Sequence, residues 1–338
     1  MTVYYLESDL PLSEAAVKIA EESSIGTWTD LATLNKKTQA KLGPKIYCLE
    51  TKNRIVKIAY PLDLFELGNI AQLLSALAGN IFSMKVIKNL RLLDIQFPQK
   101  YLNSFLGPAF GIQGVRNYLR IYNRPLIGSI IKPKVGLSAK EQAKLSYNIW
   151  LNGIDLVKDD ENLTDMRFNR FSDRVREVLK LKKIAEAKTK SKKVYVFNIT
   201  GPADLMLNRA KVVKKLGGRA VMIDIVSCGL DNAQFLRKQN LGLILHGHRA
   251  GHSMFTKNPR HGMAMLGLLE LMASQGVSEQ DMWKTALVVN SYWFSDAYIT
   301  IAIYMKNKGI EWKDVNSEEI LGINYSSTQG YKSVSSQI

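Results

Sequence analysis

Apolar residues recur with two different rhythms along this chain, and the change lies just after residue 105. In the first part, runs that alternate between apolar and polar positions predict strands, and runs with helical spacing predict helices. Leu12, Ala16 and Ile19, for example, share one face of an expected helix. The expected strands span residues 3–7, 45–51, 54–60 and 86–97, and the expected helices span residues 13–24 and 67–77. We therefore predict an N-terminal α+β domain of ferredoxin-like type over residues 1–110.

The string from Gly107 to Gly114 ends this pattern with glycines and a proline, as a domain boundary does. Short apolar runs then alternate with helical stretches. The runs span residues 126–131, 154–158, 194–199, 220–226 and 241–246, and the helices span residues 138–152, 171–188, 203–216 and 229–239. This βα alternation predicts a parallel sheet, because each crossover returns the chain in the same direction.

The predicted fold class is therefore α/β, with a (β/α) TIM-type barrel over residues 111–325 that is incomplete at its C-terminal end. Five units are expected, then a sixth strand at 286–292, a helix at 295–307 and a disordered, serine-rich tail at 326–338. Polar residues follow the expected strands, at the end of a barrel where active sites lie.

Basic residues exceed acidic ones by 46 to 30, which gives a net charge of +16. Such an excess fits an anionic small substrate or nucleic acid. The lysine runs at 36–45 and 180–193 contain no aromatic residues, and the second run is typical of the solvated face of a helix. We therefore expect no nucleic-acid partner.

Cys48 and Cys228 form neither a disulfide framework nor a metal-binding pair. The N-terminus lacks the basic and apolar segments of a signal peptide. The best candidate for a membrane span, residues 292–305, is short and contains Asp296. We expect a cytoplasmic protein with no membrane partner.

Two lysines, Lys132 and Lys134, follow the first expected barrel strand and flank Pro133. Alternation along a strand would place both on one face. Their repulsion would lower the pKa of one of them toward a range useful for acid–base catalysis. A solvated basic loop is the alternative.

The second strand ends in Lys158, Asp159, Asp160 and Glu161. Lys158 and Asp160 would share a face, Asp159 would take the other, and Glu161 could turn inward. Mg²⁺ prefers oxygen ligands, and a lysine supplies oxygen only if its neutral amine captures CO₂ as a carbamate. The two lysines of the first cluster could lower the Lys158 pKa enough for this. The alternative is a salt-bridge network.

The third cluster contains His246, His248, Arg249 and His252, with His261 close behind. His246 and His248 would face the same way on a strand, so a zinc site of the His-x-His type is one interpretation. The other makes one histidine a general base and Arg249 an anion clamp.

Together and in order, these clusters resemble the large subunit of ribulose-1,5-bisphosphate carboxylase/oxygenase (RuBisCO). The matching strings are residues 132–136, 153–162 and 246–252, with further similarity at 22–29, 78–82, 90–95 and 107–114. The resemblance covers residues 3–275. It is nearest to the archaeal-type, form III-like enzymes, which work without a small subunit.

The resemblance implies an enzyme that enolises and carboxylates ribulose 1,5-bisphosphate with Mg²⁺, uses CO₂ or O₂, and forms a homodimer or a higher homo-oligomer. Lys158 would be the carbamylated metal ligand, and Asp160 and Glu161 would complete the metal site. Lys132 would be the base or proton relay for enolisation, and His248 the base for hydration and cleavage.

The same resemblance assigns the substrate contacts. Arg249 would grip a phosphate, and Lys134 and Asn80 would contact the substrate or the added CO₂. Three further residues would belong to the site of a partner chain: Glu22, Thr27 and Trp28.

The chain departs from the family after about residue 276. We find there neither the glycine-rich loop whose lysine closes over the substrate nor the later glycine-rich phosphate turns, and Lys284 lacks a matching context. We therefore expect a truncated or divergent C-terminal end. The alternatives are a RuBisCO-like enolase or isomerase of a phosphorylated sugar, an inactive oligomerising remnant, and a His-x-His metallohydrolase with a carbamylated lysine.

Overall fold

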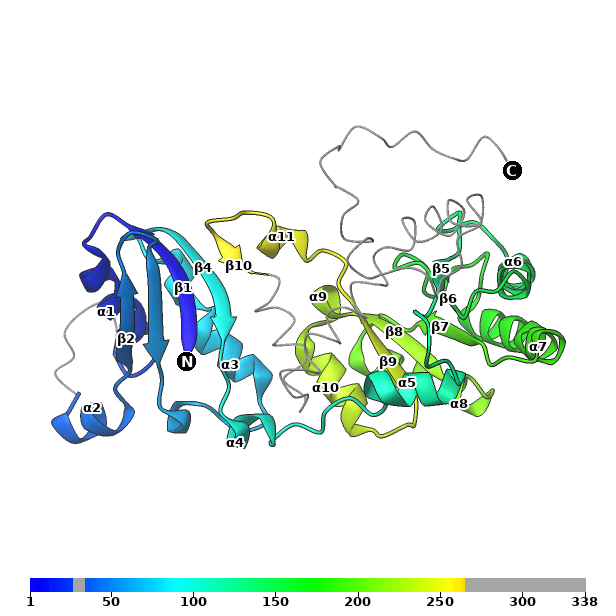
Figure 1. Ribbon diagram of the computed structural model, residues 1–338, viewed down its shortest axis with the longest axis horizontal. Helices are drawn as coiled ribbons and strands as arrows, with labels where there is room; N and C mark the ends of the chain where they lie inside the picture. Colours follow the sequence, from blue (N-terminus) through cyan, green and yellow to red (C-terminus); the bar gives the residue numbers. More distant parts are fainter. Residues whose placement is uncertain (27–33, 265–338) are drawn as a thin grey trace.

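The computed structural model describes residues 1–26 and 34–264. These residues form two five-stranded sheets that lie in opposite halves of the molecule (Figure 1). Within these ranges, every helix is too short or too polar to cross a membrane.

The first sheet is antiparallel apart from one short edge strand. Its four long strands are β1 (Thr2–Ser8), β2 (Lys45–Glu50), β3 (Ile55–Ala59) and β4 (Ile87–Ile95), in the order β4-β1-β3-β2. Helix α1 (Leu12–Glu22) follows β1, and α3 (Ile70–Leu77) follows β3. This is the βαββαβ arrangement of ferredoxin-like domains, so the prediction for this half is confirmed.

The two helices cover one face of this sheet because apolar side chains alternate toward it. Tyr4, Val56 and Leu90 project from the strands into a core that also holds Ile19 of α1 and Leu73 of α3. Shorter elements connect these parts: α2 (Lys36–Leu42), η1 (Leu62–Leu64), η2 (Asn80–Ser83) and α4 (Gln99–Leu102). The helix expected at 67–77 begins only at Ile70, where the side chain of Asn69 accepts a hydrogen bond from the backbone N–H of Gln72.

The second sheet is parallel, with its strands in chain order, as the sequence predicted. The strands are β5 (Gly128–Ile130), β6 (Leu156–Lys158), β7 (Val194–Asn198), β8 (Ala220–Asp224) and β9 (Ile244–His248). The helices are α5 (Gly111–Leu119), α6 (Ala139–Leu151), α7 (Phe171–Thr189), α8 (Ala203–Lys215), α9 (Ile225–Cys228) and α10 (Leu230–Lys238).

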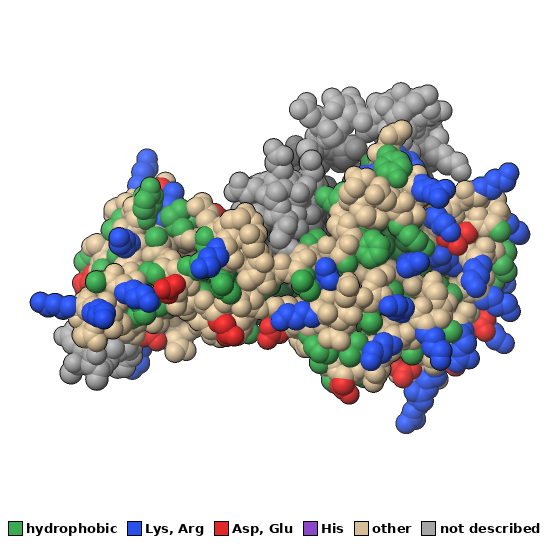
Figure 2. Space-filling view, turned by 90° about the horizontal axis from the view of Figure 1, so that it is seen from below, with side chains coloured by type: hydrophobic (Ala, Val, Ile, Leu, Met, Phe, Trp, Pro, Cys, Tyr) green, Lys and Arg blue, Asp and Glu red, His purple; other side chains and the backbone are tan. Residues whose placement is uncertain are grey.

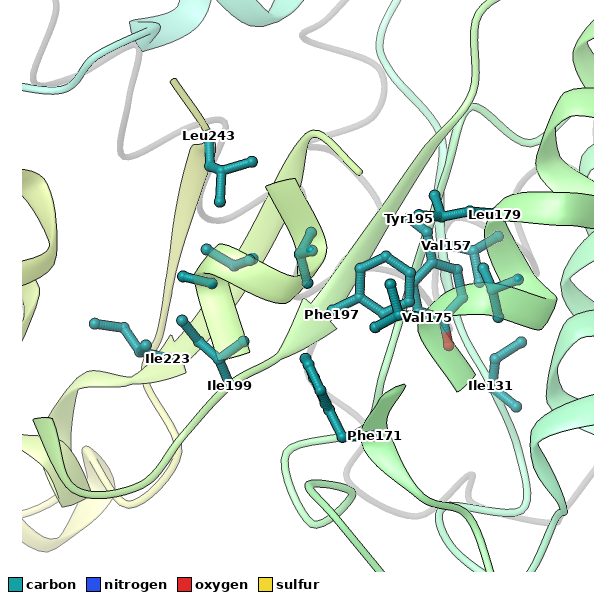
Figure 3. Close-up of a cluster of buried hydrophobic side chains, with 14 of the residues drawn as sticks. Ile131, Val157, Phe171, Val175, Leu179, Tyr195, Phe197, Ile199, Ile223 and Leu243 are labelled. Atoms are coloured by element: carbon teal, nitrogen blue, oxygen red, sulfur yellow. The ribbon is translucent and has the colours of Figure 1, made fainter. Parts of the chain in front are cut away.

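The two faces of this sheet bury different layers of side chains. On the outer face, Val157, Tyr195 and Phe197 pack against Phe171 and Val175 of α7 (Figure 3). The inner face is the one that α5 packs against, and its residues include Leu156, Val194, Val196, Ala220 and Met222. Because successive residues of a strand point to opposite faces, the position of a polar residue within its strand decides whether its side chain reaches the inner face.

Other details also differ from the sequence-based expectation. The glycine-rich string at 107–114 was expected only to break the pattern, yet α5 begins inside it at Gly111 and buries Leu119. Strand β9 begins three residues later and ends two residues later than predicted, and so includes His248. The expected strand at 220–226 ends at Asp224, where α9 begins.

The lysine run at 180–193 is only partly solvated. Lys182 is buried and pairs with Glu186 at 2.8 Å, and Lys193 is buried and donates to the carbonyl of Ile154 at 2.8 Å. Other lysines of the run are exposed. Lys and Arg side chains gather over the half that holds the parallel sheet (Figure 2), as expected for a basic protein whose excess charge lies at the surface.

After β9 the chain returns to the first sheet through α11 (Ser253–Thr256) and β10 (Gly262–Met263), which pairs parallel with β4. The sixth strand, the following helix and the tail that the sequence predicts lie outside the described residues. The proposed domain limits at 110 and 325 stay predictions.

Candidate functional site

Polar side chains collect at the C-terminal end of the parallel sheet on its inner face. Each of the strands β6 to β9 starts with an apolar inner residue and ends in a polar one on the same face: Lys158, Asn198, Asp224 and His248. This end of the sheet therefore combines a buried floor with a polar rim, the arrangement that suits chemistry on a small polar substrate.

Lys158 is 5% exposed, and its Nζ donates to the carbonyl of Asp159 at 3.1 Å and contacts Sδ of Met222 at 3.7 Å. Burial lowers the pKa of Lys158, although Glu161 and Asp160 act in the opposite direction. The lowered pKa was predicted, but its predicted cause was wrong. The cause is removal of the ammonium from water rather than repulsion by Lys132 and Lys134.

Two of the three carboxylates that follow Lys158, those of Asp160 and Glu161, reach the loop that carries the two lysines. Oδ2 of Asp160 lies 2.9 Å from Nζ of Lys132, and Oε1 of Glu161 lies 3.3 Å from Nζ of Lys134. Burial alone raises the pKa of Asp160, but hydrogen bonds from Lys132 and Asn162 outweigh it and lower the pKa. The two carboxylates therefore lie on the same side of the strand end, as the sequence predicted.

The loop after β5 does not continue as a strand, and the Lys132–Pro133 peptide bond is cis. The sequence-based expectation that repulsion between the two lysines lowers a pKa is wrong for Lys134, because the hydrogen bond and charge of Glu161 raise the pKa of Lys134. Lys134 is therefore an ammonium that can hold an anion.

Asp159 points away from this group, as predicted, into a fully buried network on the outer face. Its carboxylate accepts hydrogen bonds from Nε of Arg174 at 3.1 Å, from the hydroxyl of Tyr195 at 2.6 Å and from the backbone N–H of Asn198 at 2.9 Å. Burial and this carboxylate hold the pKa of Tyr195 well above its usual range, so the hydroxyl remains a donor.

The histidine cluster is only partly assembled at the site. His246 and His248 lie on the same face of β9, with ring centroids 6.2 Å apart. Burial, then the charges of Lys158 and His248, lower the pKa of His246 to about 3, so this imidazole is neutral. Nδ1 of His248 lies 2.7 Å from Oδ1 of Asp224.

The other two histidines, His252 and His261, contact residues outside the parallel sheet. Nδ1 of His252 lies 2.8 Å from Oγ1 of Thr256 in α11, and the ring of His261 packs edge-on against Phe82 in the N-terminal half. Arg249 directly follows β9 and is 7% exposed, and burial lowers its pKa. His246 and His248 therefore lie on β9 itself and Arg249 directly after it, while burial and the nearby charges of Arg249 and His248 lower the pKa of His252.

Asn80 and Glu22 lie together in the N-terminal half, with Nδ2 of Asn80 3.5 Å from Oε1 of Glu22. Helix α1, which ends at Glu22, and strand β6 lie in opposite halves of the molecule (Figure 1). The predicted substrate contacts thus form two groups within one chain. Thr27 and Trp28 lie outside the described residues.

Two polar residues of the site were not predicted, namely Asn198 and Asp224. Each is the last residue of an observed strand, β7 or β8, and lies one or two residues before the end of the predicted strand. A polar residue near the end of a predicted strand is the signal that could have identified them. The amide Nδ2 of Asn198 donates to the carbonyls of Asp160 at 3.2 Å and of Glu161 at 2.9 Å. Their roles depend on neighbouring strands, which the sequence does not align.

Across residues 1–26 and 34–264, no three His, Cys, Asp or Glu side chains are grouped as ligands for a metal ion. The His-x-His zinc interpretation therefore has no third ligand of these types in the described residues. Asp160 and Glu161 offer oxygen ligands of the kind Mg²⁺ prefers, and Lys158 would supply a third protein-based oxygen as a carbamate. Its lowered pKa suits that reaction, so these side chains fit the expected metal.

Comparison with known proteins gives matches along most of the chain. The family model for the ribulose bisphosphate carboxylase large chain, N-terminal domain, matches residues 1–101, and the model for the catalytic domain of the same large chain matches residues 111–329. The second match extends beyond residue 275, where the resemblance in the sequence ended.

A curated relative, the ribulose bisphosphate carboxylase of Pyrococcus horikoshii, is 48% identical over 281 residues, which are 82% of this chain and 65% of the relative. The chain thus spans slightly less than two thirds of that relative's length.

The crystal structure of octameric RuBisCO from Pyrococcus horikoshii, in complex with sulfate, is similar with a TM-score of 0.78 and 47% identity, over 81% of this chain and 66% of that one. The dimeric archaeal RuBisCO of Hyperthermus butylicus is similar with a TM-score of 0.77 and 40% identity, over 82% of this chain and 66% of that one. The fold, an N-terminal domain followed by an α/β barrel, is that of these large subunits.

Proposed function

Because the chain belongs to the ribulose bisphosphate carboxylase large-chain family, we propose that it is a ribulose-1,5-bisphosphate carboxylase/oxygenase. The reaction would be enolisation and carboxylation of ribulose 1,5-bisphosphate, giving two molecules of 3-phosphoglycerate. The observation that carries the proposal is the buried Lys158, whose pKa is lowered, two and three residues before the carboxylates of Asp160 and Glu161, which share one side of the strand end.

Lys158, Asp160 and Glu161 would hold Mg²⁺. For this the neutral amine of Lys158 would attack the carbon of CO₂. An N–C bond would form as the electron pair of one C=O π bond moves to oxygen, and the nitrogen would lose a proton to water, which leaves a carbamate. The bound cation would supply positive charge next to the oxygens on which enolisation develops negative charge.

Lys132 would serve as the base or proton relay for enolisation. Its Nζ is 2.9 Å from Asp160, and its side chain is 51% exposed, so it can reach both the carboxylates and a substrate that enters from solvent. An amine held at this place can exchange a proton with the carbon next to the substrate carbonyl.

His248 would act as the base during hydration and cleavage. The Asp224 carboxylate at Nδ1 fixes the ring and makes Nε2 the nitrogen that would exchange the proton. The bisphosphate would be held by cations: Arg249 would grip one phosphate, and the ammonium of Lys134 would contact the substrate or the added CO₂.

We also propose that two copies of the chain complete one another's sites, in a homodimer or a higher homo-oligomer without a small subunit. Glu22 and Asn80 are adjacent to each other but lie in the half of the molecule opposite to Lys158. Oε2 of Glu22 is buried and has no hydrogen-bond partner within the described ranges. Similar RuBisCO structures are octameric and dimeric. We expect a cytoplasmic enzyme with no nucleic-acid or membrane partner.

The proposal is tested by incubating purified protein with Mg²⁺ and labelled CO₂ and then adding ribulose 1,5-bisphosphate. Labelled 3-phosphoglycerate is the expected product. Exchange of the substrate's C3 hydrogen with solvent, without labelled product, would instead identify an enolase or isomerase. Neither signal from a folded protein would identify a non-catalytic member of the family.

A further inference from the structure

We infer that Asn198 is a positioning residue that sets the direction of the Asp160 and Glu161 carboxylates. This inference rests on the proposed metal site, and it concerns a residue that does not itself bind the metal. Asn198 ends β7, the strand next to β6, and its side chain is fully buried.

The proposed metal site requires that the strand conformation of β6 ends before Asp160 and Glu161. Consecutive residues of a strand point to opposite faces, so Asp160 and Glu161 could not both serve one ion if β6 continued through them. The strand ends at Lys158, and a turn closed by a hydrogen bond from the N–H of Leu163 to the carbonyl of Asp160, 3.1 Å, follows it. That turn brings both carboxylates to the lysine loop.

The amide of Asn198 holds this turn from the neighbouring strand. Its Nδ2 donates to both carbonyls of the turn, at 3.2 Å to Asp160 and 2.9 Å to Glu161. Its Oδ1 accepts the backbone N–H of Thr200 at 3.0 Å. Because both N–H groups and the oxygen of the amide make hydrogen bonds, the Asn198 side chain is held in one orientation. Its two donated bonds in turn fix the orientation of the peptide carbonyls of Asp160 and Glu161.

Asp159 fixes the backbone of Asn198, whose side chain holds the turn. Its carboxylate accepts the backbone N–H of Asn198 at 2.9 Å and is itself held by Arg174 at 3.1 Å. Asp159, directly after β6, thus accepts a hydrogen bond from the backbone of Asn198 at the end of β7. In return, the side chain of Asn198 donates to the backbone of the turn that follows β6. This mutual attachment couples the buried network to the carboxylates without contact between Arg174 and the site.

The test compares Asn198→Ala with Asn169→Ala by calorimetric titration of the full-length protein with Mg²⁺ in CO₂-containing buffer. Asn169 is a matched control: it is 1% exposed, it donates to the carbonyl of Leu137 at 2.9 Å, and its Oδ1 accepts from Arg174 at 3.1 Å. It contacts the same arginine but not the turn. Unfolding midpoints of both variants measure the general loss of stability.

We expect Asn198→Ala to weaken Mg²⁺ binding about tenfold to a hundredfold, as is usual when a residue that orients metal ligands is removed. Asn169→Ala should keep the Mg²⁺ affinity within about twofold of that of the unaltered protein. Asn198→Ser keeps one donor and gives an intermediate loss, and it replaces the alanine variant if that one does not fold. Unchanged affinity in both Asn198 variants, or an equal loss in Asn169→Ala, overturns the inference. Absence of Mg²⁺ binding in the unaltered protein would instead overturn the proposed function on which it rests.

Discussion

Nζ of Lys132 lies 2.9 Å from Oδ2 of Asp160, although the two residues are 28 positions apart in the chain. The contact joins the loop after β5 to the turn after β6, so two clusters that are separate in the sequence form one site. It also places a cation beside a carboxylate that is 1% exposed, and this cation helps to keep the carboxylate ionised. The proposed metal ligand Asp160 and the proposed enolisation base Lys132 are therefore neighbours.

The buried pair of Asp159 and Arg174 should matter far more to stability than a surface pair on the same helix. Arg174→Met leaves the Asp159 charge without its buried cation, and we expect a loss of roughly 3–5 kcal/mol in the free energy of unfolding. Arg176→Ala removes a pair with Asp173 whose side chains are 59% and 53% exposed, and should cost less than about 1 kcal/mol. Denaturant unfolding of both variants checks this, and equal losses would contradict it.

Asp224 should control the protonation chemistry of His248. Asp224→Asn removes the carboxylate 2.7 Å from Nδ1, so the ring loses the partner that fixes its tautomer. We expect kcat to fall about tenfold to a hundredfold with a smaller change in KM. Thr200→Ser is the control, because it keeps the hydroxyl that accepts the backbone N–H of Asp224 at 3.0 Å. Wild-type kcat and an unchanged pH profile in Asp224→Asn would exclude this role.

The pH dependence of CO₂ activation should reflect the lowered pKa of Lys158. Only the neutral amine reacts with CO₂, so a lowered pKa gives more reactive amine at any given pH. Activation should rise with pH and be half-complete below about 10.4, the value of an ordinary lysine. Lys134, whose pKa Glu161 raises, is the internal comparison. Labelling rates measured at fixed dissolved CO₂ test this, and a half-point at the ordinary lysine value would refute it.

Mixing two inactive variants should restore activity if copies share sites. Lys158→Ala damages the barrel part of a site, and Asn80→Ala damages the part proposed to come from the partner. Each variant alone should be nearly inactive. Randomly mixed dimers should recover about a quarter of the wild-type activity, because only a mixed dimer contains one intact site. Unfolding and refolding the variants together provides the test, and no recovery in verified mixed dimers would contradict site sharing.

The sequence predicted the parallel sheet because its strands are buried on both faces and therefore read as short apolar runs, such as the one that ends at Lys158. It also predicted that Asp159 and Asp160 point to opposite sides, which follows from strand alternation. It could not show what Asn198 and Asp224 contact, since their partners lie on neighbouring strands or beyond them. Helix α5 was hidden by its glycines, although Val115 and Leu119 have helical spacing.

The most direct test of the account is to trap labelled CO₂ on the protein chemically in the presence of Mg²⁺ and to locate it by peptide mapping. The account predicts a label at Lys158 that requires Mg²⁺ and is lost in Asp160→Asn. Lys193 is the matched control, because it is also a buried lysine whose pKa burial lowers, but its ammonium donates to the carbonyl of Ile154, away from these carboxylates. No label at Lys158, or equal labelling of Lys193, would contradict the proposed carbamate site.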